Sequence, residues 1–399
     1  MIIEKICDQL IVAMEDAGYN DSTIFNYRGV IRRFKEFCEK EGVTEYDQDI
    51  GQKYADNVIS TVTGKFSTQR YHSQRRFIRL LNSYYINGEF DFKTMKRGKQ
   101  TPNDPVARAI YDKYCAFLAE TYENRNTIHF YEYGMYSLLH YLEQYGDLDV
   151  NSLTSCDVIG YITDCKKERR REVLCELRSI FRFLDREDLI EAIAGIHAPR
   201  VKRIIPVLTD EEYERINEVI ENREISFRDA AIIRLGLSCG IRACDLINLK
   251  LSDIDWINET ISFKQSKTGN PVCLPLTIAV GNTLVRYLCE ERPPAKNNYL
   301  FVRQLAPFDA FTDHASCYAV VERVFAKAGV SKENRIFGMH MLRHNAASTM
   351  LKNRVPIETI AAILGHCSPN TTDIYITTDE KQLLECVLPM DGISKEVNP

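Results

Sequence analysis

The sequence lacks several features that would each define a class of protein. Its thirteen cysteines are an odd number and none stands at CxxC spacing, which favours reduced thiols over a disulfide framework or a zinc site. No apolar run approaches the roughly 18 residues of a membrane span. Residues 1–18 carry four carboxylates where a secretory signal would begin with basic residues. We therefore expect a cytoplasmic protein that does not enter a membrane.

A phosphate-binding loop of the form G-x-x-x-x-G-K-[ST] is also missing, so chemistry driven by a nucleoside triphosphate is not indicated. Hydrophobic residues make up 45% of the 399 residues and charged residues 27%. The chain therefore has enough apolar side chains for ordinary cores. At about 100–200 residues per domain, its length allows about two to four domains.

The net charge of −5 hides a strong asymmetry along the chain. Residues 60–100 carry nine Lys and Arg against two carboxylates, whereas residues 111–164 carry two against nine. Local patches matter for phosphate contact, although solvated helix faces explain each patch equally well. The candidate nucleic-acid-binding residues lie in the basic patches: Arg70, Arg75, Arg76, Arg79, Lys166, Lys167, Arg169, Arg170, Arg171, Lys202 and Arg203.

A helical pattern occurs twice in the first half of the chain. Residues 23–42 align without a gap with residues 127–146, with five identities and bulky apolar residues in one shared register. Five identities alone do not exclude chance, but the shared register favours duplication. We predict two related helical modules at 1–100 and 108–196, joined by a polar linker.

The region 206–399 mixes helices with a short hairpin. A capping box at Thr209 and Glu212 predicts a helix at 210–222, and a second helix is expected at 226–238. Strand patterns at 259–263 and 271–276 flank a turn at Gly269, as in a β-hairpin.

Two short groups of residues in this region could bind an anion. Gly240 can end one helix and Arg242 can start the next, where helix N–H groups and a guanidinium favour an anion. A local ion pair with Asp245 explains this group more simply. His340 and Arg343 share a helix face and can reach one phosphate. A metal site is the competing interpretation of that pair, but Arg is no metal ligand.

Residues 355–378 read as a helix, a loop and a second helix. Pro356 suits a first helical turn and Gly365 a helix end, His366 follows in the loop, and Tyr375 lies in the next helix. Taken alone, this segment fits a helix-turn-helix with Tyr375 as a core aromatic. Lys267, on the hairpin turn, would taken alone be a solvated lysine.

Taken together, six residues resemble the tyrosine recombinase (phage integrase) family. The matching phrases are G-x-R at 240–242, H-x-x-R-H at 340–344, and L-G-H at 364–366 with a Tyr nine residues after the His. Asp245 departs from a common Glu, and Asn345 from a common Thr. The implied catalytic residues are Arg242, Lys267, His340, Arg343, His366 and Tyr375.

The resemblance covers about 206–385 and implies the fold. We expect a mainly α protein in which two helical, SAM-like modules precede a tyrosine recombinase catalytic domain at 206–399 with a small β-sheet. The module at 108–196 resembles the core-binding domain of the family. The extra module at 1–100 reads as helical, where added N-terminal domains of the family are often small β-sheet units, so an arm-binding role is not implied.

The implied reaction is attack by Tyr375 on a DNA phosphodiester, giving a 3′-phosphotyrosyl link and a free 5′-hydroxyl. Two guanidiniums, at Arg242 and Arg343, suit the charge on the non-bridging oxygens, and Lys267 is the candidate acid for the leaving oxygen. His340, in preference to Asp245, would assist loss of the tyrosine proton.

His366 would hydrogen-bond the phosphate in the same reaction. The resemblance implies neither a metal nor another cofactor. Its partner would be double-stranded DNA with specific sites, bound by a homotetramer, because recombination exchanges four strands.

An apolar stripe in 379–399 is expected to dock on a neighbouring subunit, with its own domain as the alternative. The additional module favours a mobile-element integrase. Two other functions stay open: a type IB topoisomerase-like nicking enzyme, and a non-catalytic helix-turn-helix regulator.

Overall fold

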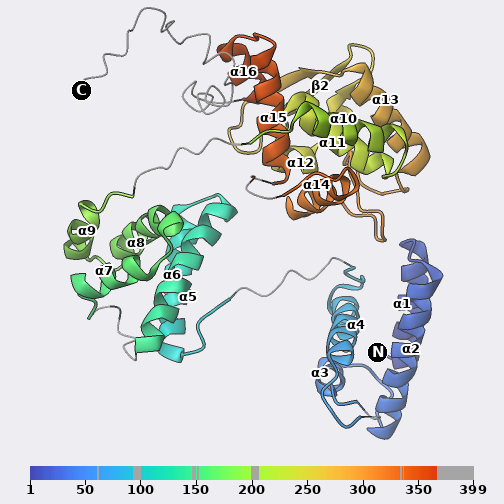
Figure 1. Ribbon diagram of the computed structural model, residues 1–399. Helices are drawn as coiled ribbons and strands as arrows, with labels where there is room; N and C mark the ends of the chain where they lie inside the picture. The colour runs from blue at the N-terminus through green and yellow to red at the C-terminus, as the bar shows by residue number, and fades with distance from the viewer. Residues whose placement is uncertain are drawn as a thin grey trace, which may run out of the picture. The chain divides into compact units, whose positions relative to one another are not determined.

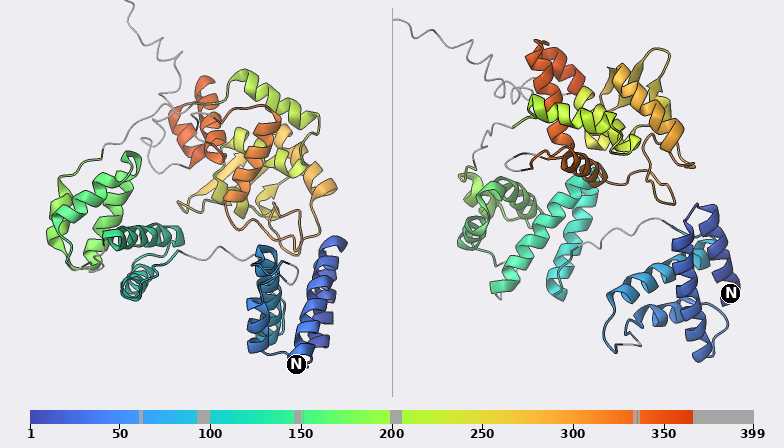
Figure 2. Two further views of the ribbon diagram at one scale, coloured as in Figure 1. Left: turned by 60° about the horizontal axis from the view of Figure 1, so that its bottom comes forward. Right: turned by 45° about the vertical axis from the view of Figure 1, so that its right-hand side comes forward.

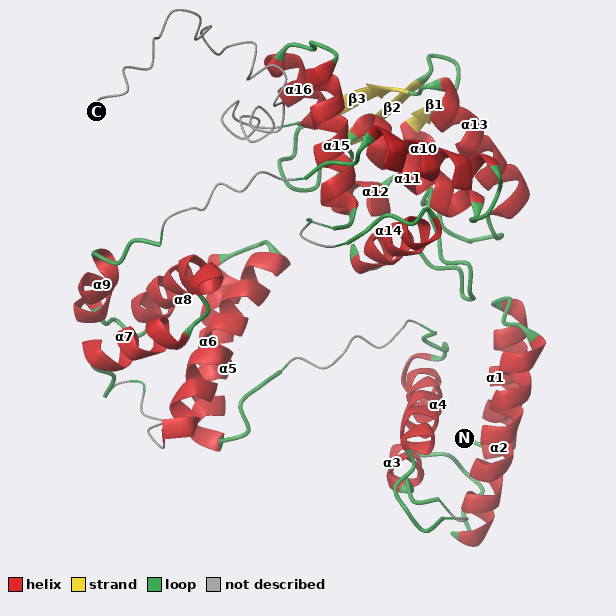
Figure 3. Ribbon diagram, in the orientation of Figure 1, coloured by secondary structure: helices red, strands yellow, loops and turns green. Residues whose placement is uncertain are grey.

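The structure is a computed structural model, described at residues 1–60, 63–92, 100–145, 150, 152–198, 206–332, 335 and 337–365. The described residues are mainly helical, with one three-stranded antiparallel sheet (Figures 1 and 3), which confirms the predicted fold class. They belong to two compact units, Thr94–Lys202 and Met1–Lys93 with Arg203–Pro399. No helix in the described ranges is both long and apolar enough to cross a membrane.

Residues 3–92 form a helical bundle around an aromatic core. Phe34 packs edge-on against Tyr46, Tyr54 and Phe77, with ring centroids 5.0 to 6.1 Å apart. Polar side chains before three of the helices accept hydrogen bonds from the first turn, as helix caps do. The helices are α1 (Ile3–Asp16), α2 (Asp21–Lys40), α3 (Gln48–Asp56) and α4 (Thr68–Asn87).

The unit Thr94–Lys202 has its own core. Asp104 caps its first helix, accepting from the backbone N–H groups of Val106 and Ala107 at 2.8 and 2.9 Å. Tyr114 is buried and donates to Ser179 at 2.8 Å, which joins the first helix of this unit to the helix that carries Ser179. The elements are α5 (Pro105–Thr121), α6 (Arg125–Tyr145), α7 (Ser155–Asp164), the 3₁₀ turn η1 (Lys167–Arg169), α8 (Arg170–Phe183) and α9 (Glu187–Ala194).

The two copies of the repeated pattern are both helices. The first copy falls on α2 and the second on α6, and equivalent positions are buried in each. The buried pairs are Ile31 with Met135, Phe34 with Leu138, and Cys38 with Leu142. Common burial is what the shared apolar register predicts, while duplication of the whole modules stays a prediction.

Residues 206–365 contain helices and the sheet. The helices are α10 (Asp210–Glu221), α11 (Phe227–Cys239), α12 (Ala243–Asn248), α13 (Ile278–Arg286), α14 (Ala315–Lys327), α15 (Met339–Lys352) and α16 (Ile357–Leu364). The shorter elements are the 3₁₀ turn η2 (Leu251–Asp253), the π-helical turn η3 (Tyr287–Glu291), and the strands β1 (Ile254–Asp255), β2 (Thr260–Lys264) and β3 (Pro271–Pro275).

Local sequence signals in this region are reproduced by the structure. Thr209 and Glu212 form the expected capping box at α10, and β2 pairs antiparallel with β3 as the predicted hairpin. The two-residue strand β1, which extends the sheet beside β2, was not predicted. Pro356 is the residue before α16 rather than part of its first turn.

Helix α11 is the centre of this region and is buried over most of its surface, as a core helix should be. It contacts α13, α14 and α15. Gly236 allows α15 to approach closely, because a Cβ atom there would lie 2.6 Å from Cδ1 of Leu342. Helices α15 and α16, the red helices of Figures 1 and 2, pack against each other.

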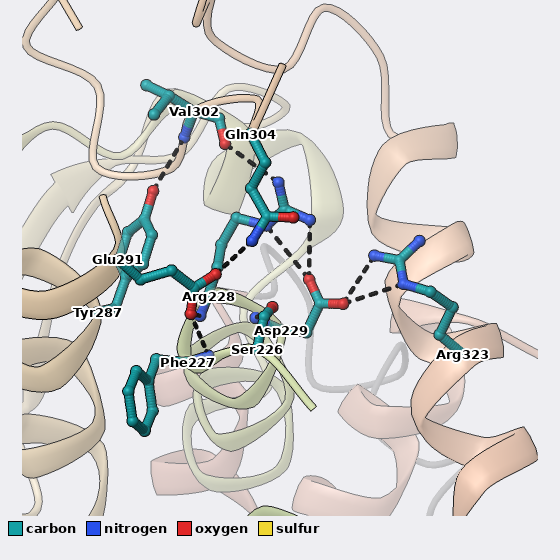
Figure 4. Close-up of polar contacts among 9 residues, drawn as sticks. All are labelled: Ser226, Phe227, Arg228, Asp229, Tyr287, Glu291, Val302, Gln304 and Arg323. Atoms are coloured by element: carbon teal, nitrogen blue, oxygen red, sulfur yellow. Dashed lines mark hydrogen bonds and ion pairs between the residues drawn. The ribbon is translucent and has the colours of Figure 1, made fainter. Parts of the chain in front are cut away.

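The N-terminal end of α11 is held by a network of charged side chains, of which Arg228 and Asp229 are buried (Figure 4). Glu291 accepts from the backbone N–H of Phe227, so the carboxylate faces the positive end of the helix dipole. Asp229 receives Arg228 on one oxygen at 3.0 Å and Arg323 on the other at 2.7 Å. This network fixes the helix whose other end leads into the candidate site.

Candidate active site

The G-x-R turn is shaped by its glycine. Gly240 ends α11 in the left-handed conformation, with φ of +61°, and glycine adopts this conformation without strain. A Cβ atom at Gly240 would lie 2.8 Å from Cδ2 of Leu364. The turn that delivers Arg242 to the start of α12 is therefore packed directly against the end of α16.

Arg343 bridges the ends of α11 and α16. Its side chain is buried, and the residue is 6% exposed. Nη1 donates to the carbonyl oxygen of Gly240 at 2.8 Å, and Nη2 donates to that of Leu364 at 2.7 Å. The guanidinium thus satisfies two backbone carbonyls that the helices leave open at their ends.

Arg242 reaches the same turn from the other side. Its Nη2 donates to the carbonyl oxygen of Gly365 at 3.2 Å, and its Nη1 donates to Oε1 of Gln265 at 2.7 Å. The two arginines therefore converge on two consecutive carbonyl groups, those of Leu364 and Gly365. These residues come immediately before His366 in the sequence.

Asp245 connects Arg242 to the hairpin. Its side chain is fully buried; Oδ2 lies 3.9 Å from Nη1 of Arg242, and Oδ1 accepts from the backbone N–H of Ser266 at 2.7 Å. Ser266 precedes Lys267 in the turn between β2 and β3. The carboxylate thus holds the hairpin turn in place, a role that its position in the sequence did not reveal.

Lys267 and His340 belong to the same electrostatic neighbourhood. Lys267 is exposed on the hairpin turn, and His340 lies in the first turn of α15. Partial burial lowers the pKa of His340, and the positive charges of Arg343, Lys267 and Arg242 lower it further. Three of the other predicted catalytic residues thus lie close enough to His340 to influence its charge, and their positive charges together suit an anion such as a phosphate.

His344 is a second histidine on α15 whose role the sequence did not indicate. Burial foremost, then His340 and Arg343, lowers the pKa of His344 to about 4. The ring is therefore neutral at neutral pH and adds no charge to the site. The remaining predicted catalytic residues, His366 and Tyr375, lie outside the described residues.

The candidate DNA-binding residues of 1–100 lie on α4. Arg75 and Arg76 are exposed, with Arg75 stacked on Tyr71 at 4.3 Å from the ring centroid and 3.6 Å from Asp56. Arg70 donates to the carbonyl of Ile59 at 2.8 Å and Arg79 to that of Asp91 at 3.1 Å. Arg70 and Arg79 therefore also make contacts that stabilise their own helical bundle.

The candidate DNA-binding residues of 108–196 also include exposed residues and residues that make contacts within their own unit. Lys166, Lys167 and Arg171 are exposed. Arg170 donates to the carbonyl of Thr163 at 2.9 Å. Arg169 donates to both carboxylate oxygens of the buried Glu176 at 3.2 Å and lies over the ring of Tyr133. Lys202 and Arg203 lie outside the described residues.

Gln265 is the residue of this site that the sequence did not single out. It is 3% exposed, and besides Arg242 it contacts Thr268 and the carbonyl of Leu364. A glutamine at the end of a strand carries no periodicity or charge signal. Its closeness to Lys267 in the sequence was the one available indication.

Known proteins are similar to this chain both in sequence and in structure. The model of the phage integrase family matches residues 206–382. A protein of Sinorhizobium fredii named as an integrase/recombinase, y4gC, is 35% identical over 165 residues, which are 41% of this chain and 84% of that protein. A second one, y4rF, is 31% identical over 229 residues, and the chain spans 54% of its length.

Proteins named as recombinases or integrases also match. Tyrosine recombinase XerA of Pyrococcus furiosus is 26% identical over 284 residues, 70% of this chain and 92% of that protein. Among solved structures, a XerH site-specific recombinase bound to difH superposes with a TM-score of 0.57 at 21% identity, covering 73% of this chain and 98% of that chain. A lambda integrase dimer on a core site gives 0.54 at 21% identity, covering 68% and 96%. The chain therefore belongs to the phage integrase family, the family of the tyrosine-type site-specific DNA recombinases.

Proposed function

We propose that this chain is a site-specific DNA recombinase that cleaves one DNA strand through a 3′-phosphotyrosyl intermediate formed by Tyr375. One observation carries the proposal: Arg242 and Arg343 converge on the carbonyls of Leu364 and Gly365. The sequence continues from this turn into His366 and, nine residues later, Tyr375.

The arginines would stabilise the charge of the pentacoordinate transition state. Two guanidiniums each offer several N–H donors in a fixed plane, and such donors act most strongly when they are preorganised. Both are held by backbone or amide acceptors rather than by flexible surface contacts. His366 would add a hydrogen bond to the phosphate.

Two proton transfers accompany the reaction. His340, whose pKa is lowered by burial and by nearby cations, would accept or relay the tyrosine proton as a neutral base. Lys267 would protonate the leaving 5′-oxygen from the hairpin turn that Asp245 holds. The proposed steps use neither a metal nor a nucleoside triphosphate, because the guanidiniums supply the charge and the phosphotyrosyl bond retains the energy of the ester.

Three domains would divide this work: helical modules at 1–100 and 108–196 and a catalytic domain at 206–399. Exposed basic side chains on α4 and α8, such as Arg76 and Arg171, would contact DNA phosphates. Lys202 and Arg203 in the following linker would add to this contact. The protein would act on DNA in the cytoplasm.

Assembly into a tetramer would follow from the exchange of four strands. Among the structural relatives, a lambda integrase tetramer is bound to a Holliday junction, with a TM-score of 0.53 at 19% identity. The segment 379–399 carries Leu383, Leu384, Val387 and Leu388 at helical spacing, and this stripe would dock on a neighbouring subunit. A mobile element is the substrate that the additional module favours.

The decisive experiment compares the wild type with Tyr375→Phe on a nicked suicide substrate. The wild type should give a covalent protein–DNA band on a denaturing gel. The Phe variant should bind the same DNA and give none, since it lacks only the hydroxyl. A covalent band with Tyr375→Phe would contradict the assignment, and supercoil relaxation without exchange between two sites would favour the topoisomerase-like alternative.

A further inference from the structure

We infer that Gln265 is a positioning residue for the proposed cleavage reaction, and that its side-chain amide orients Arg242 relative to the Lys267 turn and the end of α16. The inference rests on the proposed function. It concerns a residue that neither touches the proposed reacting atoms nor belongs to the motifs of the family.

The amide is buried and its hydrogen-bonding capacity is largely used. Gln265 is 3% exposed. Its Oε1 accepts from Nη1 of Arg242 at 2.7 Å and from Oγ1 of Thr268 at 2.8 Å, while Nε2 donates to the carbonyl of Leu364 at 3.1 Å. An amide has two lone pairs on oxygen and two N–H donors, so both acceptor sites and one donor are engaged.

These three contacts connect groups that the proposed reaction needs in fixed positions. Thr268 is the neighbour of Lys267 on the hairpin turn. Leu364 shares its carbonyl oxygen between Gln265 and Arg343, which donates at 2.7 Å. One neutral side chain is thus bonded to the first arginine, to the lysine turn and to the carbonyl that the second arginine also holds.

The backbone around Gln265 makes it a rigid support. Its N–H donates to the carbonyl of Asn270 at 2.9 Å, and its own carbonyl accepts from the N–H of Gly269 at 2.9 Å, which closes the hairpin turn. Gly365, with φ of +62°, lies so close that a Cβ atom there would be 2.2 Å from Nε2 of Gln265. The glycine before His366 is therefore required by Gln265 as well as by the left-handed backbone.

The neutrality of the amide matters for the chemistry. An oxygen acceptor fixes one edge of the Arg242 guanidinium, and Gly365 fixes the other. Asp245 already places one carboxylate 3.9 Å from Arg242, and a second carboxylate in place of the amide would weaken the attraction of the guanidinium for a phosphate further. Glutamine orients the arginine and leaves its positive charge available.

The test uses the full-length protein with Gln265→Met, which keeps the length of the side chain but removes all three contacts, and Gln265→Glu, which keeps an acceptor for Arg242. Gln144→Met is the matched control, because Gln144 is an exposed glutamine on α6, outside the site. Three quantities are measured: the single-turnover rate of covalent adduct formation, the Kd for the DNA site, and the melting temperature. Gln265→Met should cleave roughly 10–10²-fold more slowly, as expected for a misplaced reacting group, with a Kd close to that of the control.

A second substrate separates positioning from general damage. A methylphosphonate at the scissile position removes the charge of one non-bridging oxygen, so cleavage depends less on Arg242. The defects of Gln265→Met and Gln265→Glu should shrink to within a few-fold of the wild type on this substrate. If Gln265→Met fails to fold, Gln265→Glu decides by the same comparison.

Two results would overturn the inference: cleavage by Gln265→Met at the wild-type rate, or equal loss of rate on the phosphodiester and the methylphosphonate. Failure of the wild type to form a Tyr375-dependent adduct would instead contradict the proposed function. The two failures are therefore distinguishable.

Discussion

Arg343 donates from Nη1 to the carbonyl oxygen of Gly240, 2.8 Å away and 103 residues earlier in the sequence. The bond joins the two arginine motifs through the backbone, because Gly240 lies two residues before Arg242. We expect a displacement of either guanidinium to shift the other. Substitutions at the two motifs should have non-additive effects on cleavage, as is usual for residues in one network.

Lys267→Ala should slow cleavage by about 10²–10⁴-fold, the loss typical of a missing general acid. A substrate with sulfur as the 5′-bridging atom needs no proton on leaving, so the variant should recover most of its rate on it. Lys264→Ala, on the adjacent strand β2, is the control and should cleave like the wild type. If sulfur does not accelerate the Lys267 variant, the lysine is not the acid.

Cleavage should persist in excess EDTA. The proposed charge stabilisation comes from Arg242 and Arg343, which replace the Lewis acid of metal-dependent nucleases. Adduct formation is followed on the suicide substrate, with a magnesium-dependent nuclease in a parallel tube to verify chelation. Activity that disappears with EDTA and returns with magnesium would refute this account.

His344 should make stability depend on pH. Its pKa is lowered from 6.5 to about 4 by burial, so its contribution is fully present above pH 6.5 and declines as the pH falls toward 4, where the unfolded state binds a proton that the folded state does not. The free energy of unfolding should fall by about 2 kcal/mol. This is less than the full pKa shift would give, because the ring is partly exposed.

Urea unfolding between pH 7 and pH 4 measures this decline. His344→Asn should lose less stability than the wild type over this range. His314→Asn should behave like the wild type, because the His314 side chain is 78% exposed. Parallel pH curves for the wild type and His344→Asn would exclude His344 as the source.

Asp229→Leu should destabilise the region 206–365 by about 3–5 kcal/mol, because it leaves the charge of the buried Arg228 without its carboxylate (Figure 4). Arg323→Met should cost at most about 1 kcal/mol, since the Arg323 side chain is 52% exposed. Replacing Arg228 with Met in the Asp229 variant should restore much of the loss.

Fluorescence of Trp256 reports this unfolding directly, because it is the single tryptophan of the chain and follows strand β1. Equal midpoints in urea for the wild type and Asp229→Leu would show that the network is dispensable.

Deleting residues 379–399 should leave a folded protein that binds one DNA site but does not form synaptic tetramers. Burial of the apolar stripe in a neighbouring subunit would contribute about 1.5–3 kcal/mol of binding free energy per side chain, before the costs of association. Native gels with one and two sites, together with analytical ultracentrifugation, measure both properties. Recombination at the wild-type rate, or outright unfolding, would rule out docking between subunits.

Much of the fold could be predicted because its signals are local. The start of α10 follows from Thr209 and Glu212, which are three residues apart, and the end of α16 follows from Gly365. The strand β1 could not be predicted, because two residues are too few to display alternation. Helix periodicity identifies faces, and capping residues identify ends.

The motifs in the sequence predict the candidate site, but the residues that support these motifs carry no signal in the sequence. Gln265 meets a carbonyl 99 residues away, and Asp229 meets Arg323 94 residues away. The sequence near one partner gives no indication of the other. The charge of Arg169 predicts a DNA contact, but its contact with the buried Glu176 depends on how α8 packs, which charge patterns do not encode.

Arg343 and Arg242 donate hydrogen bonds to the turn at Leu364 and Gly365. This turn is therefore a fixed starting point for the segment that leads to Tyr375. Ten residues lead from Gly365 to Tyr375, and an extended chain spans at most about 3.6 Å per residue, or about 36 Å. In the proposed reaction, a tether of this length would keep the Tyr375 hydroxyl near the arginines of its own chain, at an effective concentration on the order of millimolar. Diluting the protein should therefore slow the meeting of subunits while leaving the intrinsic rate of strand cleavage unchanged.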